Sequence, residues 1–494
     1  MNLPSTLGEL KKSGYRAVTV KEEMRRNLVR MLRSGDKLFP GVVGYDDTVI
    51  PGLINAILSR HDIILLGLRG QAKSRILRAL PAFLDEYVPV VPGSPINDHP
   101  LQPITERARR LVSEQGDALK IEWLPREARY NEKLATPDVT IADLIGDVDP
   151  IKAATRRLTY ADPEVIHFGI VPRTNRGIFA INELPDLAPR IQVGLLNILE
   201  ERDIQIRGFP IRIPLDILMV FSANPEDYTS RGNIITPLKD RISSQILTHY
   251  PKDAQTAVTI TRQEAWRDRQ GPRVEIPEEV ELLVEEITFA ARESELVDQS
   301  SGVSARVPIA ALELLVSNLE RRALATGEAP VYPRLVDVHM LLPAITGKVE
   351  MVYEGEQKGA EVVARTLIGA AVKKRFAAAF PPVAREVGTP EDKGPYAPIV
   401  AWFAAGNSVS LSDEQPFAAY EAELARVPGL ASLVEKRGKS AQERAFAAEV
   451  VLEGLHQHLK LAREDLDSTV SYKEMLKFQL MRRVARGEGH SDAN

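Results

Sequence analysis

The spacing of apolar residues divides the chain near residue 254 into a part that alternates strands with helices and a part that is helical. In the first part, short continuous apolar runs are bounded by turn residues, which is typical of buried strands. Amphipathic segments between these runs predict a mostly parallel sheet covered on both faces. The expected helices are 20–33, 48–60 and 73–87, the expected strands are 61–67, 177–181, 216–224 and 245–251, and 88–103 is expected to be an irregular Pro-rich loop.

Beyond residue 254 the pattern predicts helices joined by loops, at 277–294, 308–327 and 361–380. A further helix is expected to begin at Ser440, where the sequence SAQE forms a capping box. The fold class is therefore α/β, followed by helical parts. The expected organisation is an α/β domain at 1–253, a helical domain at 254–380, a linker at 381–397, a C-terminal helical domain at 398–486 and a disordered tail at 487–494.

Composition narrows the functional classes. Of 494 residues, 27% are charged and 44% belong to the hydrophobic set, as in ordinary globular proteins. The absence of cysteine excludes disulfides, thiol catalysis and cysteine-bound zinc. A net charge of −5 makes general nucleic-acid binding an unfavoured interpretation. We expect a cytoplasmic protein with no membrane span, because no apolar signal segment opens the chain and no apolar run approaches the roughly 20 residues that cross a bilayer.

The strand expected at 61–67 leads into GLRGQAKSR at 67–75, which matches the phosphate-binding loop G-x-x-x-x-G-K-[ST] except that Ala72 replaces the last glycine. In such a loop backbone N–H groups face the phosphates, Lys73 reaches the β- and γ-phosphates, and Ser74 holds Mg²⁺. A methyl group at position 72 would crowd that approach or strain φ. The alternative is a chance glycine-rich turn. The residues expected to contact nucleotide are Gly67, Gly70, Gln71, Ala72, Lys73, Ser74 and Arg75.

Two later strands are followed by polar residues. Asn182 and Glu183 follow the strand expected at 177–181, and open parallel sheets bind ligands at the carboxyl ends of their strands. A carboxylate there can orient water for attack on a γ-phosphate; the alternative is a pair that caps the next turn. Many ATPases have an Mg²⁺-linked Asp before this Glu, so Asn182 is an unusual metal ligand. Asn224 could reach both water and γ-phosphate, or could simply form an Asn-Pro turn.

The sequence PLKDR ends in Arg241, whose guanidinium could neutralise charge in a transition state. The alternative is a surface arginine in a helix. All these signals occur in one order along the chain, and each follows a strand where one is required. Coincidence is therefore a poor explanation.

The segment RTNRGIFAINELPDLAPRIQVGLLNILEERDIQIRGFPIRIPLDILMVFSANPEDY resembles AAA+ ATPases of the MoxR and magnesium-chelatase I-subunit group. Within it, 203–214 predicts a β-hairpin through its own alternation of isoleucines with polar residues. The resemblance covers about residues 20–375 and implies an AAA+ nucleotide-binding domain with a helical lid. It implies these roles: Lys73 and Ser74 in Walker A, Glu183 as the catalytic Walker B residue, Asn182 at the Mg²⁺-linked position, Asn224 as sensor 1, Arg241 as an arginine finger acting on a neighbouring subunit, and Arg306 as sensor 2.

The resemblance implies a protein that binds ATP and Mg²⁺ and hydrolyses ATP as a ring, most simply a hexamer. It also implies remodelling or chaperone-like work with a partner that carries a von Willebrand A-type (VWA) domain; the chain itself lacks that domain's D-x-S-x-S pattern. Ala72 and Asn182 depart from the family pattern, so low turnover is expected. The alternatives are a non-hydrolysing nucleotide switch or scaffold, a magnesium chelatase subunit, and a DNA motor or transcription activator. Arg207 and Arg212 of the hairpin give the last alternative weak support.

Overall fold

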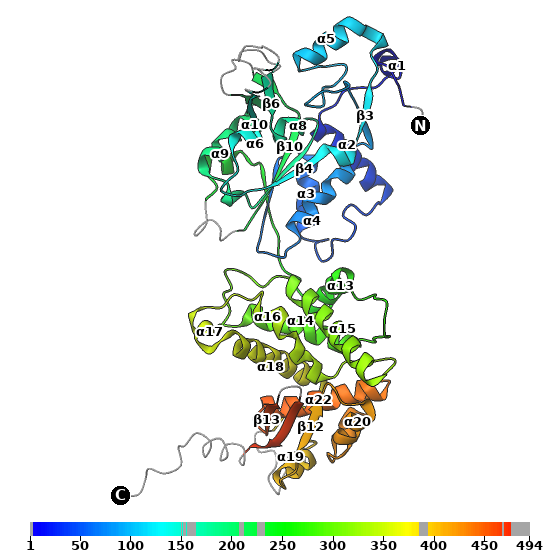
Figure 1. Cartoon of the computed structure of the whole chain (residues 1–494), viewed down its shortest axis with the longest axis vertical. Coiled ribbons are helices and arrows are strands. Elements are labelled where there is room, and N and C mark those ends of the chain that lie inside the picture. The colour runs from blue at the N-terminus through cyan, green and yellow to red at the C-terminus, as the bar shows by residue number, and fades with distance from the viewer. Residues whose placement is uncertain are drawn as a thin grey trace, which may run out of the picture. The chain divides into compact units, whose positions relative to one another are not determined.

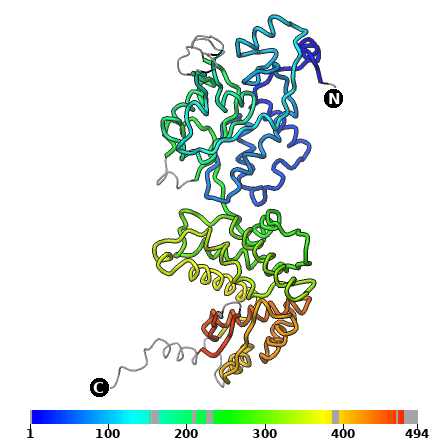
Figure 2. The backbone as a smooth tube through the Cα atoms, viewed as in Figure 1, coloured from blue at the N-terminus to red at the C-terminus, as the bar shows by residue number. Residues whose placement is uncertain are grey.

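The computed structural model describes residues 3–149, 151, 155, 165–206, 212–224, 233–384, 394–466 and 469–475. Backbone contacts divide the chain into two units, Met1–Tyr250 and Pro251–Asn494 (Figure 1). Figure 2 traces the same division along the backbone, with the first unit in blue to green. The tail expected at 487–494 and the middle of the linker expected at 381–397 lie outside the described residues.

The first unit is built on a five-stranded parallel sheet, as the apolar runs predicted. The strand order is β11-β1-β10-β7-β4. Strands β1, β7 and β10 are buried along their whole length, which explains why each appears in the sequence as a continuous apolar run. Their bounds are Ile63–Leu66 for β1, Tyr130–Leu134 for β4, Gly177–Asn182 for β7, Ile217–Ala223 for β10 and Ser244–Leu247 for β11.

Helices cover both faces of this sheet (Figure 1). On one face, alternate residues of β1, β7 and β10 pack against α2, α3 and α4 in one hydrophobic core. On the other face, the remaining residues of these strands pack against the segment that contains α9, α10 and α12. The helices of this unit are α1 (Leu7–Lys12), α2 (Val20–Ser34), α3 (Val49–Leu58), α4 (Lys73–Ala79), α5 (Glu106–Gln115), α6 (Ile141–Leu144), α8 (Ile170–Arg173), α9 (Pro189–Gly194), α10 (Leu196–Glu200) and α12 (Thr236–Arg241).

Three antiparallel strand pairs accompany the sheet. The hairpin predicted at 203–214 is confirmed by β8 (Asp203–Gln205) and β9 (Arg212–Pro214), which pair in register; its turn at 207–211 lies outside the described residues. A second pair joins β5 (Gly146–Val148) to β6 (Ile166–Phe168). The third pair, β2 (Tyr87–Val90) with β3 (Glu122–Pro125), corrects the expectation of an irregular loop from residue 88.

The helix expected at 73–87 is shorter than predicted. It ends at Ala79 and continues as a 3-10 turn, Leu80–Phe83. Pro81 has no N–H group to continue the α-helical hydrogen bonds, and its ring hinders that conformation in the preceding turn. The chain therefore leaves the helix early and enters β2.

The second unit is mainly helical, but it also contains a sheet that the sequence did not predict. Strands β12 (Val409–Ser412), β13 (Leu461–Leu466) and β14 (Thr469–Glu474) form an antiparallel sheet in the order β12-β14-β13. The helices are α13 (Ala254–Glu264), α14 (Glu278–Glu293), α15 (Arg306–Thr326), α16 (Leu342–Thr346), α17 (Tyr353–Lys358), α18 (Ala360–Ala379), α19 (Ala397–Ala404), α20 (Phe417–Ala425), α21 (Leu430–Val434) and α22 (Ala441–Gln457).

One hydrophobic core runs through the second unit, from Val280 to Tyr472. Helices α18 and α22 approach closely at Gly454 of α22. A side chain at this position would collide with the ring of Phe376 in α18. Ser440 caps α22, as the sequence predicted, by accepting a hydrogen bond from the Glu443 N–H. Residues before and after the expected linker at 381–397 thus belong to one hydrophobic core. The domain boundaries remain predictions.

No helix among the described residues has the length and apolar character needed to cross a lipid bilayer.

Candidate nucleotide site

Three of the candidate segments meet at the carboxyl edge of the parallel sheet. Leu66, the last residue of β1, lies opposite Ala223 of β10, and the Gly67 N–H donates to the Ala223 carbonyl at 3.1 Å. Ile181 of β7 lies opposite Phe221 of β10. The loop at 67–72, the Asn182–Glu183 pair and Asn224 therefore follow the ends of three adjacent strands. This edge is the place where open parallel sheets bind ligands.

The polar residues at this edge also share a face of the sheet. Side chains alternate between faces along a strand, and Leu218 and Val220 belong to the core beneath α2, α3 and α4. Ser222 continues that row, and Asn224 follows one residue after the strand ends. Asn182 continues the corresponding row of β7. The hydroxyl and amide groups thus lie on the face covered by α4, the helix that begins at Lys73.

The loop itself has the backbone of a tight turn into a helix. Gly70 has a φ of 75°, and Ala72, immediately before α4, has φ 56° and ψ 15°. Left-handed values at a non-glycine residue carry strain, because Cβ crowds the backbone. Lys73 is 7% exposed, and its amine donates to the carbonyls of Gly67 and, at 3.0 Å, Leu68. The lysine is therefore held beneath the loop.

Residues that follow β11 brace the loop. The Thr248 hydroxyl donates to the Gln71 side-chain oxygen at 2.7 Å, and the Tyr250 hydroxyl donates to the Arg69 carbonyl at 2.9 Å. A side chain at Gly67 would collide with both Thr248 and Gln71, so glycine is required there. The loop conformation is thus fixed by side chains outside the motif.

Tyr45 supports the same loop from the segment before α3. Its hydroxyl lies 3.0 Å from the Gln71 carbonyl and 2.7 Å from the His249 carbonyl. Burial raises the pKa of Tyr45 to about 12, because the phenolate form would lose its hydration. The hydroxyl therefore stays protonated and available as a donor.

A hydrogen-bond bridge joins the ends of β7 and β10. Ser222 is 1% exposed, and its hydroxyl donates to the Asn182 side-chain oxygen at 3.2 Å. The same hydroxyl accepts from the Glu183 backbone N–H at 3.3 Å. Glu183 has φ 54° and ψ 51°, a second left-handed non-glycine residue at this edge. The bridge therefore ties the two predicted Walker B positions to the neighbouring strand.

Asn224 lies one residue beyond β10. Its side-chain oxygen is buried and has no hydrogen-bond partner among the described residues. A buried acceptor without a partner costs about 1–3 kcal/mol. This atom is a candidate contact for a ligand at the sheet edge.

The two candidate arginines occupy other positions. Arg241 ends α12, where its guanidinium donates to the Glu200 carboxylate at 2.6 Å and to the Pro237 carbonyl at 2.9 Å. No hydrogen bond described for Arg241 reaches the loop at 67–72. Arg306 belongs to the second unit, where it is exposed at the first position of α15. Of the hairpin arginines, Arg212 pairs with Asp203 at 3.3 Å, and Arg207 lies outside the described residues.

Sequence reasoning did not single out Ser222, Thr248 or Tyr45. Ser222 carried a signal, because it is the one hydroxyl in the apolar run ILMVFSA of β10. A lone polar residue near the end of a fully buried strand indicates a partner on an adjacent strand, since buried polar groups need hydrogen bonds. Thr248 and Tyr45 gave no comparable signal.

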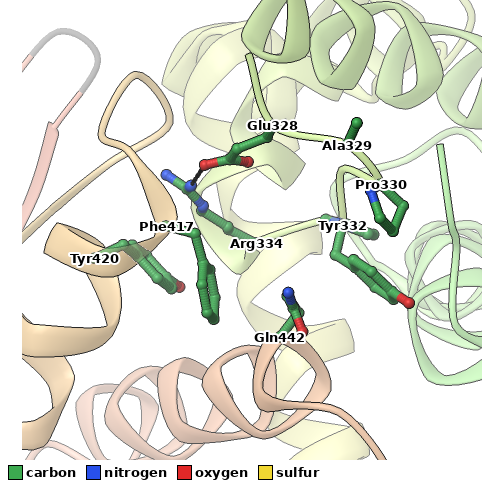
Figure 3. A pocket seen from close by; sticks show the side chains of 9 residues that line it. Glu328, Ala329, Pro330, Tyr332, Arg334, Phe417, Tyr420 and Gln442 are labelled. Carbon is green, nitrogen blue, oxygen red and sulfur yellow. Dashed lines mark hydrogen bonds and ion pairs between the residues drawn. The ribbon is translucent and has the colours of Figure 1, made fainter. Parts of the chain in front are cut away.

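A separate cavity of about 180 Å³ lies within the second unit, between the segment 328–334, α20 and α22 (Figure 3). Arg334 points into it and pairs with Glu328 at 2.9 Å, while its guanidinium lies 4.5 Å from the centre of the Tyr420 ring. Arg334 also donates to the carbonyls of Ser412 and Gln415. The charges of this cavity are thus paired with one another.

No family model and no curated protein matches this chain. Solved structures that it is similar to include NtrX from Brucella abortus bound to ADP, with 17% identity over 60% of this chain and 55% of that one, at a TM-score of 0.34. The chain thus spans little more than half of NtrX. They also include a candidate ATPase from Cytophaga hutchinsonii, with 16% identity over 73% and 97% of the two chains, at a TM-score of 0.30.

One chain of a complex between subunits BchI and BchD of magnesium chelatase, based on a cryo-EM reconstruction, is similar at 19% identity over 65% of this chain and 98% of that one, with a TM-score of 0.35.

Proposed function

We propose that the chain is an AAA+ ATPase of the MoxR and magnesium-chelatase type, which binds ATP with Mg²⁺ and hydrolyses it slowly. One observation carries the proposal: the P-loop, the Asn182–Glu183 pair and Asn224 follow the carboxyl ends of three adjacent parallel strands. The order of the motifs along the chain supports it independently. A chance glycine-rich turn would not require the other two strands to end in polar residues at the same edge.

The residues present suit a nucleotide with its metal. The buried side-chain oxygen of Asn224 lacks a partner among the described residues, as expected of an atom that meets a ligand. Lys73 would bind the phosphates, and Ser74 would bind Mg²⁺ directly. Asn182 would act on the ion through water, because an amide oxygen accepts a hydrogen bond. Mg²⁺ commonly keeps several waters, so one neutral second contact is compatible with binding.

The chemistry assigned to the chain's own residues is positioning and charge stabilisation. Glu183 would hold a water in line with the γ-phosphate and accept its proton. Asn224 would contact the same water and the γ-phosphate. When bound, Mg²⁺ supplies charge neutralisation between the β- and γ-phosphates. Because Asn182 contributes no negative charge, we expect turnover well below the roughly 10 per second of a median enzyme.

The test combines nucleotide binding with phosphate release from the intact chain. Lys73→Ala should abolish binding of a fluorescent ATP analogue, since the phosphates lose their cation. Glu183→Gln should retain binding and stop phosphate release. Lys37→Ala, at an exposed lysine of the same unit, serves as the matched control and should change neither. Unaltered ATP binding by Lys73→Ala would refute the proposed site.

A non-hydrolysing nucleotide switch is the second candidate. Two observations favour it: Ala72 holds a left-handed backbone where the motif has glycine, and Asn182 takes the position of the metal-linked Asp. Binding would be retained in such a protein. Wild-type phosphate release that never exceeds that of Glu183→Gln would establish the switch.

We further propose that the protein works as a ring, most simply a hexamer, in which Arg241 completes the site of a neighbouring subunit. Arg241 is partly exposed and its known partner, Glu200, lies at the surface. A VWA-domain partner and the sensing role of Arg306 are the parts of the proposal that rest on the sequence resemblance alone, and a cytoplasmic location rests on the composition and hydropathy of the sequence. A magnesium chelatase role remains the alternative that a metal-insertion assay would test.

A further inference from the structure

Ser222 differs from every other side chain in the core of β10. Six of the seven residues of that strand are apolar, and the seventh is a buried hydroxyl. Burying a hydroxyl costs free energy unless it is hydrogen-bonded. Here the hydroxyl is used twice, as donor to Asn182 and as acceptor from Glu183. Both partners belong to the proposed site, and neither lies on the strand of Ser222.

We propose that Ser222 is a positioning residue for ATP hydrolysis, which sets the orientation of Asn182 and the backbone of Glu183 through its two hydrogen bonds. This inference rests on the proposed function. Ser222 would not touch the substrate. Its effect would pass to the metal-linked water through Asn182 and to the attacking water through Glu183.

The conformation of Glu183 explains why such a support is needed. A left-handed backbone is strained at a non-glycine residue because Cβ crowds the following carbonyl oxygen, and Glu183 has φ 54°. Residues in sparsely populated conformations persist only where surrounding contacts hold them. The bond from the Glu183 N–H to Ser222 is such a contact, since it fixes the peptide that precedes the strained residue.

The bond to Asn182 determines which end of its amide faces Ser222. The Asn182 oxygen accepts from the hydroxyl, and Asn182 is 8% exposed. An amide carries an acceptor at one end and two donors at the other. Because the serine donates to the oxygen, that oxygen faces Ser222, on the face of the sheet that α4 covers. The bond thereby links the metal-linked position to β10, the strand that Asn224 follows.

The test compares variants that keep or remove the hydroxyl at constant shape. Ser222→Thr keeps the hydroxyl, and Ser222→Val has the same shape without it. Ser222→Ala removes the hydroxyl without adding volume. Loss of one hydrogen bond typically corresponds to roughly a twofold to tenfold change, and the hydroxyl makes two. We expect Ser222→Ala and Ser222→Val to lose threefold to tenfold or more in kcat, with the Kd for a fluorescent ATP analogue changed less than about threefold.

Rescue by the matched variant is the decisive readout, and Ser222→Thr should recover kcat relative to Ser222→Val. Equal kcat for the Thr and Val variants, or an unchanged kcat in Ser222→Ala while Glu183→Gln is inactive, would overturn the inference and leave the ATPase proposal intact. A loss of ATP binding that matches the loss of kcat would show a merely structural role and would also overturn it. If wild type releases no more phosphate than Glu183→Gln, the ATPase proposal and this inference fail together.

Discussion

Replacing Ala72 with glycine tests whether the departure from the P-loop pattern is a source of strain. Ala72 has φ 56° and ψ 15° and lies immediately before α4, where its methyl group cannot cap the helix. A left-handed conformation costs a non-glycine residue roughly 1–2 kcal/mol. Ala72 is exposed, so its methyl group contributes little packing that glycine would lose. We therefore expect Ala72→Gly to stabilise the folded chain.

The size of the effect follows from two opposing contributions. Glycine removes the strain in the folded state, but its unfolded chain has more conformational freedom, which costs about 0.5–1 kcal/mol. The net gain should be about 0.5–1 kcal/mol, since the strain is the larger contribution. At about 2–4 °C per kcal/mol for a unit of this size, the rise in Tm should be about 1–4 °C.

Calorimetry of the intact chain without nucleotide measures this rise. Ala377→Gly is the matched control, because Ala377 is also exposed but lies within the helix α18. Glycine there should lower stability by about 0.5–1 kcal/mol. Opposite signs for the two substitutions would support the argument. A loss in Ala72→Gly as large as that in Ala377→Gly would refute the idea that the loop holds Ala72 under strain.

Two further predictions concern assembly and pH. If Arg241 completes a neighbouring site, mixing inactive Arg241→Ala with inactive Glu183→Gln should restore partial phosphate release, and protein that sediments as a monomer at every concentration with nucleotide would contradict this. Burial raises the pKa of Glu449, which accepts from the Tyr420 hydroxyl, from 4.5 to about 7. The protonated Glu449 carboxyl contributes its full stability below pH 4.5, and this contribution is lost as the pH rises through 7 and the buried group ionises. The Glu449→Gln variant should therefore become more stable relative to wild type between pH 4.5 and pH 8, by on the order of 3 kcal/mol. Urea unfolding of both proteins at both pH values measures this change. The same difference in unfolding free energy at the two pH values would exclude the buried carboxyl as the cause.

The main sheet could be predicted because its central strands are buried on both faces. Such strands must be apolar at every position, so β1, β7 and β10 stand out as continuous runs. Strands of the smaller sheets lack that property. β13, with the sequence LAREDL, and β14, with TVSYKE, mix charged and apolar residues, and their identity as strands depends on pairing with each other. Strand propensity of this kind depends on tertiary context, which a single sequence does not contain.

The candidate site was predictable only in part, and for a related reason. Motif spacing fixes which residues follow which strands, so Lys73, Asn182 and Asn224 could be placed at one edge before the structure was known. Contacts across strands depend on register. Only the alignment of β10 with β7 brings Ser222 to Asn182, and only the position of β11 brings Thr248 to the loop. These supporting residues have no motif of their own.

Replacing Asn182 tests its effect on stability as well as its proposed role in metal binding. Its side chain is 8% exposed and is bonded to one hydroxyl, that of Ser222. A carboxylate in the same place would lose hydration and gain little in return until a cation arrived. Asn182→Asp should thus lower Tm in the absence of Mg²⁺ and ATP. Binding of these ligands to the folded state alone should recover much of the loss.

The same substitution should raise the rate of phosphate release, because the side chain would place a negative charge beside the metal. Calorimetry with and without Mg-ATP, paired with phosphate release, separates the two effects. A variant that loses Tm equally in both conditions and releases phosphate no faster would show that position 182 does not act on the metal.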